Sequence, residues 1–371
     1  MGEGEGGMAD EAANRASFHV QAGYCTAMAA PITARICAAL ADALDRDTET
    51  GRAVLDWPGE PVADAVVLRL VGGLHSLHRQ HVDPAVSAVF RGEETEPAAV
   101  QRTLAGVLRR HDAALRPWLD GPPQTNEAGR AAGLMTGLLH LARRHGPAME
   151  ILEIGSSAGL NLLIDRFRFD LSGVAVGPPD SPVLIRPEWR GPPPLDAPIA
   201  IRSTRGVDIA PLDPADPAHA ERLQAFVWID AVERVTRMEA CLAMARERAP
   251  RLEQGDAADW VEQALAEPQE AGVTRVLMHS VTWQYMPGAS QARVRAAMER
   301  AGARATPERP LGWVMMEPNR DLHRHEVRVR DWPGADRMEM VALTHAHGAW
   351  VEALEPPYAI TEYVMRGHAP G

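Results

Sequence analysis

The chain has 371 residues and a formal net charge of −12, with 50 acidic residues against 38 lysines and arginines. It has no dense basic run, so we expect no nucleic-acid partner, since tracking phosphates takes clustered Lys and Arg. No run approaches about 18 apolar residues, so no membrane span is expected. Three cysteines without a CxxC pair are typical of a reduced, cytoplasmic protein. Composition does not fix an oligomeric state.

The N-terminal third of the sequence is predicted to be helical. Residues 1–13 are acidic and glycine-rich, lack the basic and apolar regions of a signal peptide, and are expected to be disordered. Residues 14–121 place apolar side chains three and four apart, with almost no alternation. They are predicted to form an all-helical N-terminal domain, which Gly-Pro-Pro at 121–123 ends.

Residues 122–371 are predicted to form a Rossmann-like, mostly parallel sheet with helices between its strands. The expected strands cover residues 149–154, 226–229, 252–254, 275–279 and 311–316. A short turn between 327–330 and 338–344 predicts a C-terminal antiparallel hairpin. Eleven prolines between Pro178 and Pro217 argue against regular helix or central strand in 168–222. That segment is interpreted as an extended insertion packed over one end of the sheet.

The most informative motif is the turn at residues 151–161, where a strand ends in an acid, a glycine turn and the start of a helix. Such turns bind nucleotides in open α/β sheets. A dinucleotide fingerprint needs glycine where this chain has Ser157 and Leu160. A carboxylate at Glu153 would repel a pyrophosphate but suits the amine and sulfonium of S-adenosylmethionine. The predicted cofactor contacts in the turn are Glu153, Gly155, Ser156, Gly159 and Asn161; the alternative is a plain strand–helix turn.

Two further acids follow expected strands and are predicted to contact the same cofactor. Asp230 ends the strand at 226–229, where an acid can accept hydrogen bonds from ribose hydroxyls. Asp170, closer to the turn in sequence, competes for that role. Asp256 follows the strand at 252–254 and is predicted to contact the adenine amine. For Asp230 and Asp256, capping of the following helix is the alternative.

The segment after the strand at 275–279 is predicted to line the reacting end of the site. His279 is a candidate general base, Tyr285 is a second candidate catalytic residue, and a structural histidine is the alternative. Glu317 follows the next strand and has the same positional argument. The residues predicted to bind substrate are Asn126, Arg130, Glu188, Trp189 and Trp283. The spaced histidines fix no third ligand, so no metal site is predicted.

The order EIGSSAGLN, WID, GDA and HSVTW, followed by a hairpin, resembles the class I S-adenosylmethionine-dependent methyltransferases. The stretches QTNEAGRAAGL, LEIGSSAGLNLLIDRFRFD and PEWRG resemble more closely an uncharacterised bacterial family, domain of unknown function 2332. The methyltransferase resemblance implies that the glycine turn holds the methionine end of the cofactor, Asp230 the ribose and Asp256 the adenine. Ser157 in place of a glycine departs from that pattern, and so does the distance from the turn to Asp230.

These patterns predict a methyltransferase that uses S-adenosylmethionine to modify a small molecule. Methyl transfer depends mainly on proximity and in-line orientation, so a catalytic triad is not required. No Asn-Pro-Pro-Tyr follows the fourth expected strand, which gives no support for methylation of nucleic-acid bases or glutamine. The alternatives are a non-catalytic S-adenosylmethionine or nucleotide sensor and a nicotinamide oxidoreductase.

Overall fold

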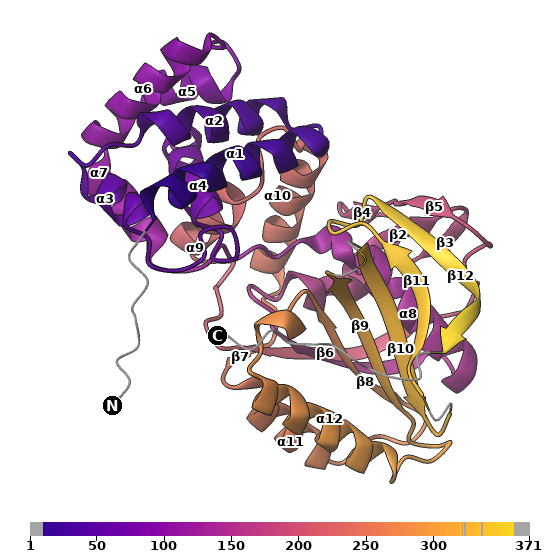
Figure 1. Ribbon diagram of the computed structural model, residues 1–371. Helices are drawn as coiled ribbons and strands as arrows, with labels where there is room; N and C mark the ends of the chain where they lie inside the picture. The colour runs from indigo at the N-terminus through magenta and orange to yellow at the C-terminus, as the bar shows by residue number, and fades with distance from the viewer. Residues whose placement is uncertain (1–9, 321, 323, 335–336, 360–371) are drawn as a thin grey trace, which may run out of the picture. The chain divides into compact units, whose positions relative to one another are not determined.

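The computed structural model describes residues 10–320, 322, 324–334 and 337–359, and the chain divides into two compact units. The first unit is Met1–Thr125 with Pro217–Thr236, and the second is Asn126–Asp216 with Arg237–Gly371 (Figure 1). Of the tail predicted to be disordered, residues 1–9 lie outside the described residues. For the last residues of this tail the prediction of disorder is wrong, because the Asp10 carboxylate caps a helix by accepting from the backbone N–H groups of Ala12 and Ala13.

The described elements of the first unit are helices whose starts follow local rules. Proline occupies the first position of four of them, and side-chain oxygens of Thr48, Asp83 and Glu96 cap three helix starts, two of which begin with proline. Their bounds are α1 (Glu11–Ala27), α2 (Pro31–Ala43), α3 (Glu49–Leu55), α4 (Val66–Arg79), α5 (Pro84–Phe90), α6 (Pro97–Arg110), α7 (Asp112–Leu115), the 3-10 helix η1 (Arg116–Leu119), α9 (Pro217–Ala225) and the first residues of α10 (Val232–Glu247).

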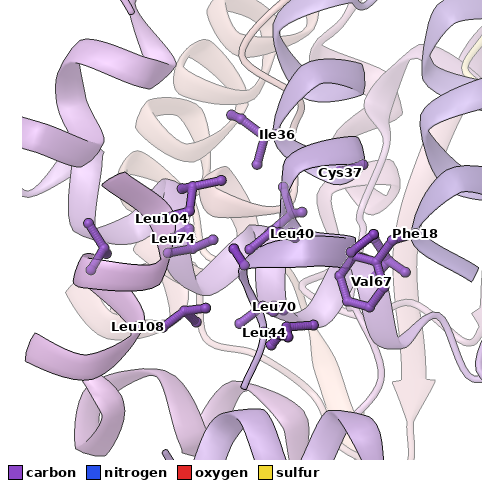
Figure 2. Packing of buried hydrophobic residues seen from close by; sticks show 14 of the residues in the cluster. Phe18, Ile36, Cys37, Leu40, Leu44, Val67, Leu70, Leu74, Leu104 and Leu108 are labelled. Atoms are coloured by element: carbon purple, nitrogen blue, oxygen red, sulfur yellow. The ribbon is translucent and has the colours of Figure 1, made fainter. Parts of the chain in front are cut away.

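Leucines and other apolar residues from these helices form one continuous core (Figure 2). Leu40, Leu70, Leu74 and Leu104 are each fully buried in it. The segment 226–229, predicted to be a strand, has no strand structure. Its residues belong to the first unit, and Trp228 packs against the helical core. The prediction of a strand there is wrong because the apolar run is buried among helices.

The second unit is built on a large, mostly parallel nine-stranded sheet with the order β5-β12-β11-β10-β9-β8-β1-β6-β7. Strands β7, β6, β1, β8 and β9 run parallel, whereas β9 through β12 pair antiparallel in chain order. The bounds are β1 (Ala148–Ile154), β5 (Glu188–Arg190), β6 (Ala200–Asp208), β7 (Leu252–Gln254), β8 (Thr274–Ser280), β9 (Leu311–Asn319), β10 (Arg324–Trp332), β11 (Glu339–Thr344) and β12 (Trp350–Ala359). The antiparallel pairing of β10 with β11 is the hairpin that the short turn predicts.

Helices pack on both faces of this sheet (Figure 1). On one face, Gly133 and Gly137 of α8 let the helix approach β9 and β10 closely. On the other face, α11 and α12 form an apolar cluster with the strands. The helices of this unit are the 3-10 helix η2 (Ala128–Arg130), α8 (Ala131–His145), the 3-10 helix η3 (Leu160–Arg166), the rest of α10, α11 (Ala257–Ala266), the 3-10 helix η4 (Trp283–Tyr285) and α12 (Gly288–Gly302). Within the described residues, no helix has the length and apolar character needed to cross a membrane.

Parts of the proline-rich segment form strands of the large sheet, which corrects the prediction that the segment is an insertion packed over one end of the sheet. The eleven prolines exclude a central strand only where they occur. Residues 199–210 contain no proline, and β6 within them pairs with β1 on one side and β7 on the other. The strand β5 forms the far edge, and a separate three-stranded sheet contains β2 (Arg168–Leu171), β3 (Val174–Val176) and β4 (Leu184–Ile185).

Candidate functional site

The parallel strands bring several polar residues to one edge of the sheet. We call this the carboxyl edge, the edge formed by the ends of β1, β6, β7, β8 and β9. The chain passes from β1 to β6 and β7 on one side, and then returns to β8 on the other side of β1. Ligands of open α/β sheets sit outside the carboxyl ends at such a reversal. The residues at or just beyond these strand ends are Gly155, Asp208, Asp256, Thr282 and Glu317.

The turn after β1 is held by close contacts that only glycine permits. Gly155 has φ +66°, and a Cβ there would lie 2.2 Å from the side chain of Thr282, which follows β8. Gly159 has φ +71°, and a Cβ there would lie 2.7 Å from Pro250. The backbone N–H groups of Gly155 and Ser156 donate to the Val207 carbonyl at 2.9 and 3.2 Å. The turn is therefore fixed against both strands that flank β1.

Two residues with side chains adopt the left-handed backbone conformation beside these glycines. Ser157 has φ +55° in the turn, and Val281 has φ +54° directly after β8. Positive φ is a genuine outlier for a β-branched residue such as valine. The Val281 N–H donates to the Met316 carbonyl at 3.0 Å, so its neighbours enforce this conformation. Strain of this kind gathers at ligand sites, which supports this edge as the candidate site.

Glu153 is a buried acid for which the described residues provide no counter-charge. Only 2% of the residue is exposed, and its Oε2 has no hydrogen-bond partner in the described part of the chain. Burial raises the pKa of Glu153 to about 8, and the charge of Asp208 raises it further, whereas hydrogen bonds from Ser156 and Asn161 oppose the shift. At pH 7 the group is mostly neutral. A cation placed beside it would favour the carboxylate and release a proton.

Protein oxygens already occupy backbone amides of the turn. The Asp208 carboxylate accepts from Ser157 N at 2.7 Å and from Ala210 N at 2.9 Å. The Asn126 amide oxygen accepts from Leu160 N at 2.7 Å, at the start of η3. An anion at a strand–helix turn normally takes such amides. With Asp208 and Glu153 both beside it, this turn suits a cationic ligand rather than a pyrophosphate.

Asp208 occupies the position that the sequence predicted for Asp230. It ends β6, the strand next to β1, whereas Asp230 lies in the first unit. There Asp230 accepts from Ile32 N at 2.8 Å and from Thr33 N at 2.9 Å, so it caps α2. Asp170 lies in β2 of the small sheet and pairs with Arg186. The signal that was missed is the nine-residue strand Ala200–Asp208, which contains no proline.

Asp256 follows β7 at the carboxyl edge and caps α11. Its carboxylate accepts from Ala258 N at 2.8 Å and from Asp259 N at 3.1 Å. Helix capping was the alternative interpretation of this residue, and it is the contact that the structure contains. A role toward adenine stays a prediction.

His279 and Glu317 form a fully buried pair, with 0% and 1% of their side chains exposed. The two groups meet at 2.6 Å through Nδ1 and Oε1, and the same Oε1 accepts from Thr282 N at 3.0 Å and Trp283 N at 3.3 Å. The His279 ring stacks on Trp283, with centroids 5.2 Å apart. The pair therefore anchors the loop after β8, the loop whose Thr282 contacts Gly155.

This pair lies on the face of the sheet opposite Glu153. Leu152 and Ile154 pack in the apolar cluster that also contains Trp283, and Glu153 alternates to the other face. Tyr285 is 71% exposed, whereas His279 and Trp283 are fully buried. The three residues predicted to line one reacting surface therefore lie in different environments.

The residues predicted to bind substrate are divided in the same way. Asn126 contacts the turn, and Arg130 follows it at the start of α8, where its Nε donates to the Ala346 carbonyl at 3.1 Å. Glu188 and Trp189 belong to β5, with five strands between β5 and β1, so the strand order does not bring them to this turn. Among the described residues, no three His, Cys, Asp or Glu side chains gather as a metal site would require.

These features define an α/β protein with a candidate small-ligand site at the carboxyl edge of β1, β6 and β8. The chain belongs to the family described as uncharacterized protein conserved in bacteria (DUF2332), whose model matches residues 15–353. The resemblance to this family, drawn from its motifs, is thereby confirmed. A comparison with curated proteins finds no match.

Proposed function

We propose that the protein is an S-adenosylmethionine-dependent methyltransferase that acts on a small molecule. One observation carries the proposal: an oxygen of Glu153 that is buried without a partner among the described residues lies beside a glycine turn whose Ser157 N–H donates to a second acid, Asp208. A buried acid without a counter-charge destabilises the folded protein unless a ligand supplies the charge. The ammonium group at the methionine end of the cofactor has that charge, and a pyrophosphate has the opposite one.

The neighbouring residues fit the remainder of such a ligand. Asp208 replaces Asp230 as the acid that would accept hydrogen bonds from ribose hydroxyls, because it ends the strand beside β1. Ile209 follows it and is 75% exposed, an apolar surface suited to the flat face of a base. Asp256 remains the candidate for contact with the adenine amine. When bound, S-adenosylmethionine supplies an electrophilic methyl group.

The contribution of the chain to this reaction is positioning. Gly155 and Thr282 bring the β1 and β8 loops into contact at the reversal of the sheet, so a ligand held by the turn faces the β8 loop. Orientation of this kind supplies much of the rate enhancement in methyl transfer between bound partners. Because His279 is fully buried against Trp283, we assign it to holding this loop rather than to proton transfer.

The test is calorimetry at pH 7 with S-adenosylmethionine, S-adenosylhomocysteine and NAD, in two buffers of different ionisation enthalpy. We expect the first two to bind and to release up to about one proton each, because the pKa of Glu153 near 8 falls when a cation arrives. Glu153→Gln should abolish the proton release and weaken binding at least tenfold, about 1.4 kcal/mol. Glu270→Gln, an exposed acid in the same unit, should bind as the wild type does.

Three results would overturn parts of this proposal. No binding of S-adenosylmethionine to the wild type at millimolar concentration would reject the cofactor. Binding of NAD alone would favour the oxidoreductase. Binding without turnover of any acceptor in a broad screen would favour a sensor.

A further inference from the structure

Two arginines of the first unit, Arg69 and Arg222, lie near each other over aromatic side chains. Arg222 belongs to α9, and its guanidinium carbon lies 5.1 Å from the ring centre of Trp118 and 5.2 Å from that of Phe226. Arg69 belongs to α4, and its guanidinium carbon lies 5.0 Å from the ring centre of Trp57. Burial lowers the pKa of Arg222, and the charge of Arg69 lowers it further, so the two guanidinium groups are close enough to repel each other.

The two rings beneath Arg222 pack closely against glycines in the middle of α4. A Cβ at Gly72 would lie 2.6 Å from the Phe226 ring, and one at Gly73 would lie 2.9 Å from the Trp118 ring. Glycine inside a helix is less stable than alanine, so this close approach has a cost. The two rings meet edge to face, with their centroids 5.5 Å apart. Such packing fixes the position of the guanidinium group that lies over both rings.

The N–H groups of Arg222 are unused donors. Among the described residues, its guanidinium interacts with the two rings and with the charge of Arg69, and no oxygen accepts from it. Its nitrogens are not sealed in the interior, so they are accessible to a ligand. A Cβ at Gly121 would lie 3.8 Å from Arg222 Nη2, and the Gly121 N–H donates to no acceptor in the described part of the chain. A backbone donor is therefore also available close to the guanidinium.

The acids nearest to these residues along the chain pair with other arginines. Glu221, which precedes Arg222 in α9, pairs with Arg79 at 3.2 Å. Asp120, which precedes Gly121, pairs with Arg116 at 2.5 Å. These two acids therefore do not supply the counter-charge of Arg222.

Arg69 has partners of its own, unlike Arg222. Its Nε donates to the Asp64 carbonyl and its Nη1 to the Leu119 carbonyl, each at 2.8 Å. Burial lowers the pKa of Arg69, and the charge of the Asp64 carboxylate opposes this shift. Asp64 thus balances the charge of Arg69, which leaves one positive charge, that of Arg222, unbalanced among the described residues.

We propose that the guanidinium of Arg222 binds the carboxylate of a small organic acid, so that the first unit contains a ligand site of its own. The parallel N–H groups of a guanidinium match the two oxygens of a carboxylate. One unbalanced positive charge suits a monoanion, whereas a phosphate dianion would require a second. This inference does not depend on the proposed function, because Arg222 and the glycine turn after β1 belong to different units.

The experiment uses acetate as the probe, with the full chain carrying ¹⁵N-labelled tryptophan and observed by NMR at constant ionic strength. We expect the Trp118 indole N–H signal, assigned with Trp118→Phe, to shift saturably at millimolar acetate. Arg222→Gln should weaken this binding by about tenfold or more, because a charged donor is lost. Arg222→Lys should weaken it less, because the charge stays and only the paired N–H geometry is lost. Arg102→Gln, at an exposed arginine of α6, is the matched control and should bind as the wild type does.

Three outcomes would overturn the inference. Shifts that never saturate, or that persist unchanged in a folded Arg222→Gln variant, would show that Arg222 does not bind an anion. Tighter binding of inorganic phosphate than of acetate would reject the carboxylate. If Arg222→Gln does not fold, Arg222→Lys decides: weaker acetate binding than in the wild type supports the paired contact, and equal binding rejects it.

Discussion

Two buried acids at the carboxyl edge, Glu153 and Glu317, differ in the hydrogen bonds that they receive. One oxygen of Glu317 accepts from the His279 ring and from two backbone N–H groups of the β8 loop, whereas its other oxygen, like Oε2 of Glu153, has no hydrogen-bond partner among the described residues. Glu153 has hydrogen bonds from Ser156 and Asn161, and its pKa is raised to about 8. A buried acid that accepts hydrogen bonds from several segments of the chain holds those segments in place. A buried acid without enough donors marks a place that a ligand completes.

The largest expected effect tests whether Glu317 holds the β8 loop in place. Glu317→Leu removes the acceptor of His279 Nδ1 and of two backbone N–H groups, and should destabilise the protein by about 3–5 kcal/mol. Glu317→Gln keeps an acceptor oxygen and should lose about 1–2 kcal/mol. Urea unfolding measures both. Equal losses for the two variants would show that the hydrogen bonds to the β8 loop do not stabilise it.

The second prediction tests the contact between Thr282 and Gly155. Thr282 links the surroundings of the two acids, because its N–H donates to Glu317 and its side chain packs against Gly155 in the turn after Glu153. Gly155→Ala combines positive φ with a clash and should lower the free energy of unfolding by about 2–3 kcal/mol. Gly173→Ala is the control, because Gly173 has φ +95° and open space around it. It should lose about 1 kcal/mol. Similar losses at both positions would mean that the Thr282 side chain moves aside for the added methyl group at little cost.

The smallest expected effect is a gain in stability relative to the wild type, whereas the two substitutions above reduce stability. The pKa of Glu153 is raised from 4.5 to about 8, so its stabilising contribution is complete below pH 4.5 and is lost as pH rises to about 8. The stability of Glu153→Gln relative to wild type should therefore rise by about 1–3 kcal/mol over that interval and stay constant above it. Thermal unfolding from pH 4.5 to 9 measures this, with Glu270→Gln as control. Parallel curves for Glu153→Gln and the wild type would contradict an uncharged Glu153.

The sequence predicted what depends on local pattern. Glu153, Gly155 and Gly159 lie where the strand–turn–helix motif placed them, because a buried strand and obligatory glycines leave a direct trace in the chain. Strands β7, β8 and β9 were found for the same reason. The strand at β6 was missed because prolines on both sides dominated the interpretation of a segment that contains none.

The errors concern partners that are distant in the chain. Asp230 looks like a strand-end acid in sequence, but it caps a helix about 200 residues earlier, a pairing that only packing decides. Arg130 and His325 lie close enough for the charge of Arg130 to lower the pKa of His325, although almost 200 positions separate them. Glu317 was selected by position, but its bond to His279 depends on the register of β8 with β9.

The pairing of β5 with β12 has a consequence for how the protein folds during synthesis. Glu188 of β5 lies beside Trp350 of β12, so this edge of the sheet closes only after β12 has left the ribosome. Until then β5 has no neighbour in the large sheet, and the open edge can pair with other chains. Contacts between residues so far apart also slow folding. A nascent chain halted before β12 therefore keeps this edge open to pairing with other chains.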